Sequence, residues 1–265
     1  MRLVYDNVIV PFDGTNEGRA GLAVAGDLAW RSGAKVVIVN NTPASGAESK
    51  QAVKSRAMSL SGADVDFWVD TEHSLPQALV AAAQYRSDPV ICLSTKGRAG
   101  SLFSKRWSLP ALAEEVLRDA PVPVLLVGPN ADTSRGLPMT EIVVATDGSA
   151  RSEAALPLAA AWAQEFKLRL LLVGVVPDTK QDDSGELSYL ASLIDAVRGD
   201  LKAAEFELLR APDPVDGLIG YLRQHPDAVV AMCTTGRTGK AGSIGSTARK
   251  IIERSPRAVL LTRAA

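Results

Sequence analysis

The chain alternates between short runs of branched apolar residues and longer segments in which apolar residues recur at helical spacing. Runs such as Val8–Val10 and Ile142–Val144 contain no alternating polar positions, which is typical of strands buried on both faces of a sheet. Because strand and helix alternate throughout, the connections should be right-handed crossovers and the sheet mainly parallel, with helices on both faces. The pattern therefore predicts a doubly wound α/β fold.

The predicted elements follow the same order in the two halves of the chain. In the first half we expect strands at 7–12, 35–40, 64–70, 89–94 and 122–127, and helices at 15–32, 46–60, 75–86 and 109–119. In the second half we expect strands at 141–146, 168–175, 205–210, 228–233 and 258–262, and helices at 150–166, 184–202, 214–225 and 245–254. Two of the predicted helices begin with capping signals: Ser74 precedes Gln77 by three residues, and Asp213 directly precedes Pro214. The polar segment 177–186 has loop composition and no informative chemistry.

An internal repeat divides the chain. Asp13-Gly14-Thr15 follows the first strand as Asp147-Gly148-Ser149 follows the strand at 141–146, and Asp147 lies 134 residues after Asp13 in a chain of 265. We therefore expect two tandem domains, 1–130 and 139–265, each large enough to bury its own core, joined by the polar stretch 128–136. The last strand of each half should pair with the other, giving an intramolecular pseudo-dimer that protects two sheet edges.

The composition narrows the function classes. Hydrophobic residues make up 46% and charged residues 22%, which is ordinary for a soluble globular protein. A net charge of −1 provides no field that would attract nucleic acid or an anionic membrane. The apolar runs have strand length, and the N-terminus lacks a basic segment followed by an apolar core, so we expect a cytoplasmic protein with no membrane span or signal peptide.

The cysteines and histidines suggest no metal centre. Cys92 and Cys233 each lie inside a predicted buried strand, away from any CxxC or Cys/His cluster. We interpret them as small hydrophobes in a reducing compartment, with redox sensitivity as the alternative. His73 and His225 fall in different halves without a nearby ligand partner, so we expect no metal site.

Ligands of open parallel sheets bind beyond the carboxyl ends of the strands. In the second half the Asp147 turn, the strand end at 174–176 and the glycine-rich loop 234–247 should converge there. Glycines in this loop expose backbone N–H groups, and Gly245-Ser246-Thr247 opens a helix whose positive end favours phosphate. The alternative is a surface loop in which Ser246 caps the helix. Neither the P-loop spacing nor the Rossmann fingerprint is present.

Three pairs of matching segments carry a family resemblance. They are VIVPFDGT with VVATDGS, STKGRAG with TTGRTG, and AEEVLRDAPVPVLLV with ARKIIERSPRAVLLT. Together they resemble the universal stress protein family across nearly the whole chain. The resemblance implies five-stranded parallel α/β domains of the adenine nucleotide alpha hydrolase-like type, which pair through their last strands and fall into nucleotide-binding and non-binding groups.

The nucleotide-binding group carries the pattern Gly-x2-Gly-x9-Gly-(Ser/Thr), in which the glycine loops hold phosphates and ribose. Its first-strand aspartate lies near the nucleoside, and the end of its second strand contacts adenine. The second half has Cys233 at the first glycine position and eight intervening residues instead of nine. The implied nucleotide-binding residues are Ala145, Asp147, Val175, Thr234, Gly236, Arg237, Gly239, Gly245, Ser246 and Thr247.

The first half departs further from this pattern. Ser94 stands at the first glycine, Asn41 ends the second strand, and either Trp107-Ser108 or Pro110-Ala111 replaces the final Gly-Ser pair, depending on the alignment. We therefore expect a degenerate site there. The weaker matches in this half are Pro11, Asp13, Asn41, Gly97 and Gly100.

The resemblance implies a cytosolic tandem universal stress protein that acts as a stress-response regulator and binds ATP or ADP in its second half. Bound nucleotide would alter the surface offered to a protein partner of unknown identity or to a second copy in a homodimer. The alternative is a nucleotide-independent interaction scaffold with both sites degenerate. We assign no catalytic residue, because no SGGxDS or HxGH motif is present, although slow ATP hydrolysis at Asp147 stays open.

Overall fold

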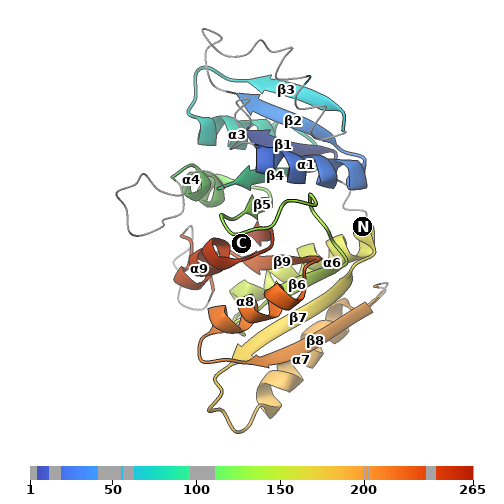
Figure 1. The fold of residues 1–265 in the computed structure, drawn as a ribbon, viewed down its shortest axis with the longest axis vertical. Helices are drawn as coiled ribbons and strands as arrows, with labels where there is room; N and C mark the ends of the chain where they lie inside the picture. The colour runs from blue at the N-terminus through green and yellow to red at the C-terminus, as the bar shows by residue number, and fades with distance from the viewer. Residues whose placement is uncertain are drawn as a thin grey trace. The chain divides into compact units, whose positions relative to one another are not determined.

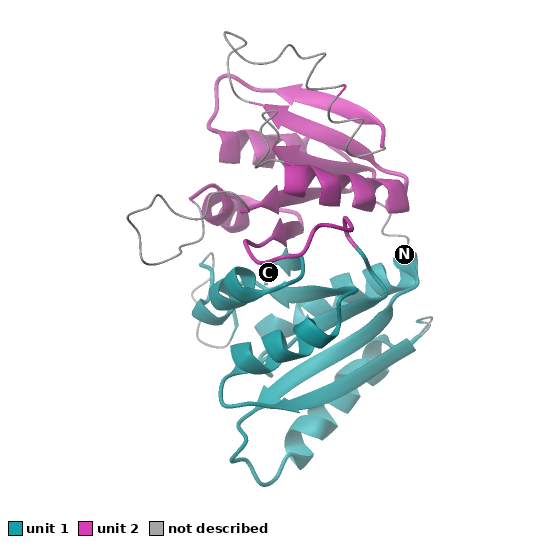
Figure 2. Ribbon diagram, viewed as in Figure 1, with its two compact units in different colours: residues 1–3, 138–265 teal, residues 4–137 magenta. Residues whose placement is uncertain are grey.

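Strands rich in branched apolar side chains form the centre of two compact units in the computed structural model. The structure describes residues 5–11, 19–40, 55, 63–95, 111–199, 201, 203–236 and 243–264. One compact unit spans 4–137 and the other is built from 138–265 (Figure 2). We call them the N-terminal unit and the C-terminal unit.

The N-terminal unit contains a parallel sheet with the strand order β3-β2-β1-β4-β5. Its strands are β1 (Asn7–Pro11), β2 (Lys35–Asn40), β3 (Val65–Val69), β4 (Pro89–Ser94) and β5 (Val124–Val127). Helix α1 (Arg19–Ser32) packs on one face, and the neighbouring helices α3 (Leu75–Gln84) and α4 (Ala111–Asp119) lie on the other.

The C-terminal unit repeats this topology with the strand order β10-β9-β6-β7-β8. Its strands are β6 (Glu141–Ala145), β7 (Arg169–Val176), β8 (Ala203–Arg210), β9 (Ala228–Cys233) and β10 (Val259–Thr262). Helices α8 (Pro214–Gln224) and α9 (Ser246–Arg254) cover one face, while α5 (Ala150–Glu153), α6 (Ala155–Phe166) and α7 (Ser184–Val197) lie on the other (Figure 1).

The central strands are buried as a doubly wound fold requires. Ile142, Val143 and Val144 in β6 have no exposed surface, and every residue of β9 is buried. Helices cover both faces of each sheet, so the strands contain continuous apolar runs rather than alternating ones. The predicted fold class is confirmed, and each strand lies within two residues of its predicted bounds. The pairing predicted between the two last strands stays a prediction.

Two helices differ from their predicted form. The helix expected at 150–166 is divided at Ala154 into α5 and α6. Pro157 explains the division, because its ring nitrogen cannot donate to the carbonyl of Glu153 four residues earlier. The helix expected at 184–202 ends at Val197, two residues before Gly199, whose φ is +20°. The predicted helix at 46–60 and the start of the one at 15–32 lie outside the described elements.

Both predicted helix caps are formed. The backbone N–H of Ser74 donates to Gln77 Oε1 at 3.1 Å, and Asp213 accepts from the backbone N–H of Val215 at 2.8 Å. The stretch after β5 packs against its own unit: the backbone N–H of Leu137 donates to Asp27 Oδ2 of α1 at 2.8 Å. Gly136, with φ of +70°, brings the chain against the same carboxylate, where a side chain at position 136 would collide.

Candidate functional site

The turn after β6 presents an aspartate at the carboxyl edge of the C-terminal sheet. Asp147 Oδ1 accepts hydrogen bonds from the backbone N–H of Ser149 at 3.1 Å and from its hydroxyl at 2.5 Å. Gly148 has φ of +76°, a conformation that glycine adopts without strain. Ser149 then caps α5 by accepting from the backbone N–H of Ser152 at 3.3 Å. The turn therefore holds the carboxylate at the end of a buried strand.

Asp147 lies directly against Gly236, which follows β9. A Cβ atom at position 236 would lie 3.1 Å from Asp147 Cγ and closer still to Oδ2, so a larger residue would displace the carboxylate. This close approach gives Gly236 a steric role. By contrast, a Cβ at Gly245 would meet Thr234 O at an ordinary 3.5 Å. The backbone N–H of Gly245 donates to that same oxygen at 2.8 Å, which closes the base of the loop.

These residues surround a cavity of about 370 Å³ on the α8 and α9 face of the sheet. Such a volume lies in the range of small-molecule sites. Every predicted site residue of the C-terminal unit that the structure describes lines this cavity, namely Ala145, Asp147, Val175, Thr234, Gly236, Gly245, Ser246 and Thr247. The predictions for Arg237, Gly239, Asp13, Asn41, Gly97 and Gly100 fall outside the described residues, and Pro11 ends β1.

Several lining residues were not among the predicted site residues. They are Thr146, Ser152, Val173, Pro214, Leu218, Met232, Cys233, Thr235, Ala248 and Ile251. Pro214 and Leu218 are four residues apart on α8, and Ala248 and Ile251 three apart on α9, so helical periodicity could have assigned each pair to one face. Together they give the cavity a largely apolar wall opposite the polar loop.

The N-terminus of α9 opens at this cavity. Gly245 occupies the N-cap position with φ of −62° and ψ of 153° and has no side chain to cap the helix. This contradicts the alternative in which Ser246 caps the helix, because Ser246 is already its first helical residue. Helices α5 and α8, by comparison, are capped by Ser149 and Asp213. The N-cap residue therefore contributes no side chain to the first-turn N–H groups of α9, an arrangement suited to an anionic group.

Both cysteines are buried, as predicted. Cys92 has no exposed surface, and burial raises the pKa of its thiol to about 12. Cys233 is 5% exposed and lines the cavity at the position where the family pattern has its first glycine. Its sulfur lies 4.0 Å from the hydroxyl of Thr235. A side chain therefore forms part of the wall where the nucleotide-binding pattern has none.

A second cavity of about 390 Å³ lies behind the Asp147 turn, on the α7 face. It shares Thr146, Asp147 and Val175 with the first cavity. Its wall includes Lys180 and Glu186, which form an ion pair. The segment 177–186, to which the sequence assigned no chemistry, is therefore part of a cavity wall. Arg210 of β8 anchors it by an ion pair with Asp183 and a 2.7 Å hydrogen bond to Lys180 O.

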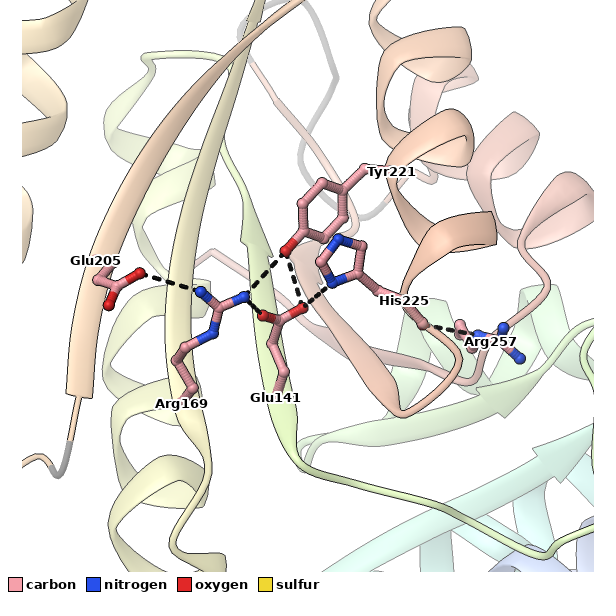
Figure 3. A network of polar contacts seen from close by, with 6 residues as sticks. All are labelled: Glu141, Arg169, Glu205, Tyr221, His225 and Arg257. Carbon is pink, nitrogen blue, oxygen red and sulfur yellow. Dashed lines mark hydrogen bonds and ion pairs between the residues drawn. The ribbon is translucent and has the colours of Figure 1, made fainter.

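The opposite end of the same sheet contains a polar network around Glu141, the first residue of β6 (Figure 3). Glu141 forms an ion pair with Arg169, accepts from the Tyr221 hydroxyl at 3.0 Å, and lies 3.4 Å from His225 Nδ1. The rings of Tyr221 and His225 stack with centroids 3.8 Å apart. Arg169 also donates to Glu205 at 3.0 Å.

This network closes the amino edge of the sheet. Glu141 is 5% exposed, and its partners come from β7, α8 and the residue that directly follows α8. Burial, followed by the charge of Glu141, raises the pKa of Tyr221 well above its usual value, which keeps the phenol neutral and donating. Within the described part of the chain, no group of three His, Cys, Asp or Glu side chains is arranged to hold a metal ion.

The family comparison supports the resemblance drawn from the sequence. The model of the universal stress protein family matches residues 139–263. No match was found among curated protein sequences. In the described residues, no helix combines the length and the hydrophobicity needed to cross a lipid bilayer.

Solved structures of similar fold cover nearly the whole chain. A universal stress protein from Archaeoglobus fulgidus DSM 4304 is 15% identical, with a TM-score of 0.68 over 98% of this chain and 99% of that chain. A functionally unknown protein from Pseudomonas aeruginosa PAO1 is 20% identical, with a TM-score of 0.63 over 99% and 94%. A putative universal stress protein from Pseudomonas aeruginosa UCBPP-PA14 is 21% identical, with a TM-score of 0.62 over 98% and 94%. These likenesses show that the chain shares their fold.

Proposed function

We propose that the C-terminal unit, whose residues 139–263 match the model of the universal stress protein family, binds an adenine nucleotide, ATP or ADP, as a regulatory ligand. Three segments distant in sequence support this proposal because they meet at one cavity. They are the Asp147 turn, the end of β7 at Val175, and the loop from Thr234 to the start of α9. Their convergence is the observation that carries the proposal.

The chemistry of the cavity suits the two ends of a nucleotide. Val173, Val175, Leu218 and Ile251 offer apolar surface for a purine base, and Asp147 can accept hydrogen bonds from a sugar hydroxyl. The N-terminus of α9, where Gly245 leaves the first N–H groups uncovered by a capping side chain, favours a phosphate group. The ligand would thus lie with its base between β7 and the apolar side chains of α8 and α9, and with its phosphates at the N-terminus of α9.

We further propose that the nucleotide regulates binding rather than serving as a substrate. Nucleotide bound in the cavity would change the surface that the C-terminal unit presents to a protein partner or to a second copy of the chain. Partner binding that stays the same at saturating ATP would contradict this regulatory role.

The decisive experiment measures the nucleotide content of freshly purified protein and then titrates the nucleotide-free protein with ATP and ADP by calorimetry. Wild type should bind close to one equivalent. Asp147→Ala should abolish binding, because it removes the carboxylate at the cavity. The matched variant Asp13→Ala, at the corresponding aspartate of the N-terminal half, should bind like wild type. Loss of binding in both variants would contradict a single site in the C-terminal unit.

A nucleotide-independent scaffold is the second candidate, and the position of Cys233 favours it. A cysteine side chain in the cavity wall reduces the space that the family pattern leaves open by its first glycine. The same preparation distinguishes the two functions. Protein that carries no nucleotide and gives no heat at millimolar ATP would support the scaffold.

A further inference from the structure

The Asp147 turn is held from behind by a residue that does not line the first cavity. Tyr189 of α7 lines the second cavity, on the other face of the sheet, together with Thr146 and Asp147. Its hydroxyl donates to Glu153 Oε1 at 2.7 Å. Thr146 precedes Asp147, and Glu153 ends the short helix that follows it. The phenol therefore ties the helix that follows the turn to α7, and it shares a cavity wall with Thr146 and Asp147.

The contacts inside the turn connect this helix to the backbone at Asp147. The hydroxyls of Thr146 and Ser152 lie 2.8 Å apart, and the backbone N–H of Gly148 donates to Thr146 Oγ1 at 3.2 Å. The backbone N–H of Asp147 donates to Ser152 Oγ at 3.3 Å. These bonds join residues at most six positions apart. The Tyr189–Glu153 bond, by contrast, spans 36 positions and ties the turn to α7.

We propose that Tyr189 is a positioning residue for the ligand cavity: its hydroxyl fixes the Asp147 turn from the opposite face of the sheet and keeps the carboxylate against Gly236. This inference rests on the proposed function for its effect on affinity, although the positioning itself does not require a ligand. The contact also gives ligand binding a route to α7 and to the segment 177–186.

The protonation state of the Tyr189 hydroxyl agrees with this positioning role. Burial raises the pKa of Tyr189 to about 12, and the hydrogen bond to Glu153 acts in the same direction. At neutral pH the side chain is therefore a neutral donor, and Glu153 can serve as its acceptor.

The test uses two phenols of the C-terminal unit as a matched pair. Tyr189→Phe removes the hydroxyl behind the turn, whereas Tyr221→Phe removes a hydroxyl that also donates to a glutamate but lies at the other end of β6. In the ligand-free protein, Tyr189→Phe should shift the NMR signal of the Gly148 amide, because that amide donates to Thr146. Tyr221→Phe should leave the signal in place.

Calorimetry with ATP then measures the consequence. We expect Tyr189→Phe to bind ATP five- to tenfold more weakly than wild type and Tyr221→Phe to stay within twofold. Glu153→Ala should reproduce the loss, and Glu153→Gln should restore most of the affinity because its amide oxygen can still accept the bond. A merely structural effect would not be rescued selectively by the glutamine.

The outcomes separate this inference from the proposed function. If Tyr189→Phe leaves both the Gly148 signal and the affinity as they are in Tyr221→Phe, the positioning role is overturned. If wild type binds no nucleotide but Tyr189→Phe still shifts the Gly148 signal, the positioning role stands and the proposed function fails.

Discussion

Strand β6 has a carboxylate at each end, and the two are held in opposite ways. Glu141, at its start, is buried among three partners, namely Arg169 of β7, Tyr221 of α8 and His225, which directly follows α8. Asp147, just beyond its end, accepts bonds from the nearby Ser149 and lines two cavities. The comparison teaches that the same strand is fixed at one edge of the sheet by a buried carboxylate with several partners, and that at the other edge it presents a carboxylate to the cavities.

The N-terminal unit has a neutral side chain where the C-terminal unit has Glu141. At the position that corresponds to Glu141, β1 begins with Asn7, whose side-chain amide donates to Ser87 O at 2.9 Å. Asn7 is 6% exposed and therefore as buried as Glu141. At this position a neutral hydrogen bond in one unit thus takes the place of the ion pair and its neighbours in the other.

Removing Glu141 should have the largest effect. Glu141→Ala leaves the guanidinium of Arg169 and the phenol of Tyr221 without their buried acceptor, so we expect the free energy of unfolding of the C-terminal unit to fall by about 3 kcal/mol. Urea titration followed by hydrogen exchange of the β6 and β7 amides measures this. Glu205→Ala, which removes the exposed acceptor of the same arginine, should cost less than about 1 kcal/mol. Equal losses in the two variants would contradict a structural role specific to Glu141.

Displacing Asp147 should affect ligand binding more than stability. Gly236→Ala places a Cβ against the carboxylate, and we expect an affinity loss of about tenfold, or about 1.4 kcal/mol, in calorimetry with ATP. Gly245→Ala is the matched control, since its Cβ makes an ordinary contact and the backbone N–H groups of α9 remain. It should bind within about twofold of wild type. A large loss in the control alone would move the steric requirement from Gly236 to the helix start.

The stability of the C-terminal unit should depend on alkaline pH, because a tyrosine with a raised pKa lies near each end of β6. Burial raises the pKa of Tyr189 to about 12 and raises that of Tyr221 further, whereas a tyrosine in the unfolded chain has a pKa of about 10. A raised folded-state pKa gives stability that is present below pH ~10 and is lost as the pH rises through the folded value. The urea midpoint of the C-terminal unit should therefore fall with pH between about 10 and 12. Either phenylalanine variant should flatten this dependence, and a variant of the exposed Tyr85 should leave it unchanged.

The smallest effect on stability should come from completing the cap of α9. Gly245→Asp supplies a side-chain acceptor at an extended position with room for a Cβ, so thermal unfolding should show a gain of a few tenths of a kcal/mol. The same carboxylate would compete with phosphate for the first N–H groups and weaken ATP binding. Gly245→Asn, which caps without charge, separates capping from charge repulsion. Unchanged ATP affinity in the aspartate variant would place the phosphates away from α9.

The local sequence pattern was sufficient to predict the helices and strands and the turns that build the site. Branched apolar runs predicted the strands because a strand covered on both faces excludes polar side chains, and Ser74 and Asp213 marked helix starts through contacts at most three residues away. The Asp147 turn and Gly236 could be assigned in the same way, since parallel strands bring their carboxyl ends to one edge.

Only the tertiary structure decided which residues that lie far apart in the sequence contact one another. Nothing near Glu141 indicates that Tyr221, 80 positions later, would donate to it, and nothing near Asp147 indicates that Tyr189 lies behind its turn. Nor does the sequence of the glycine-rich loop reveal that Gly236, rather than Gly245, is the glycine whose missing side chain admits the aspartate. Hydrophobic periodicity specifies which face of an element is buried, but the distances between side chains on different elements depend on how the packed elements meet.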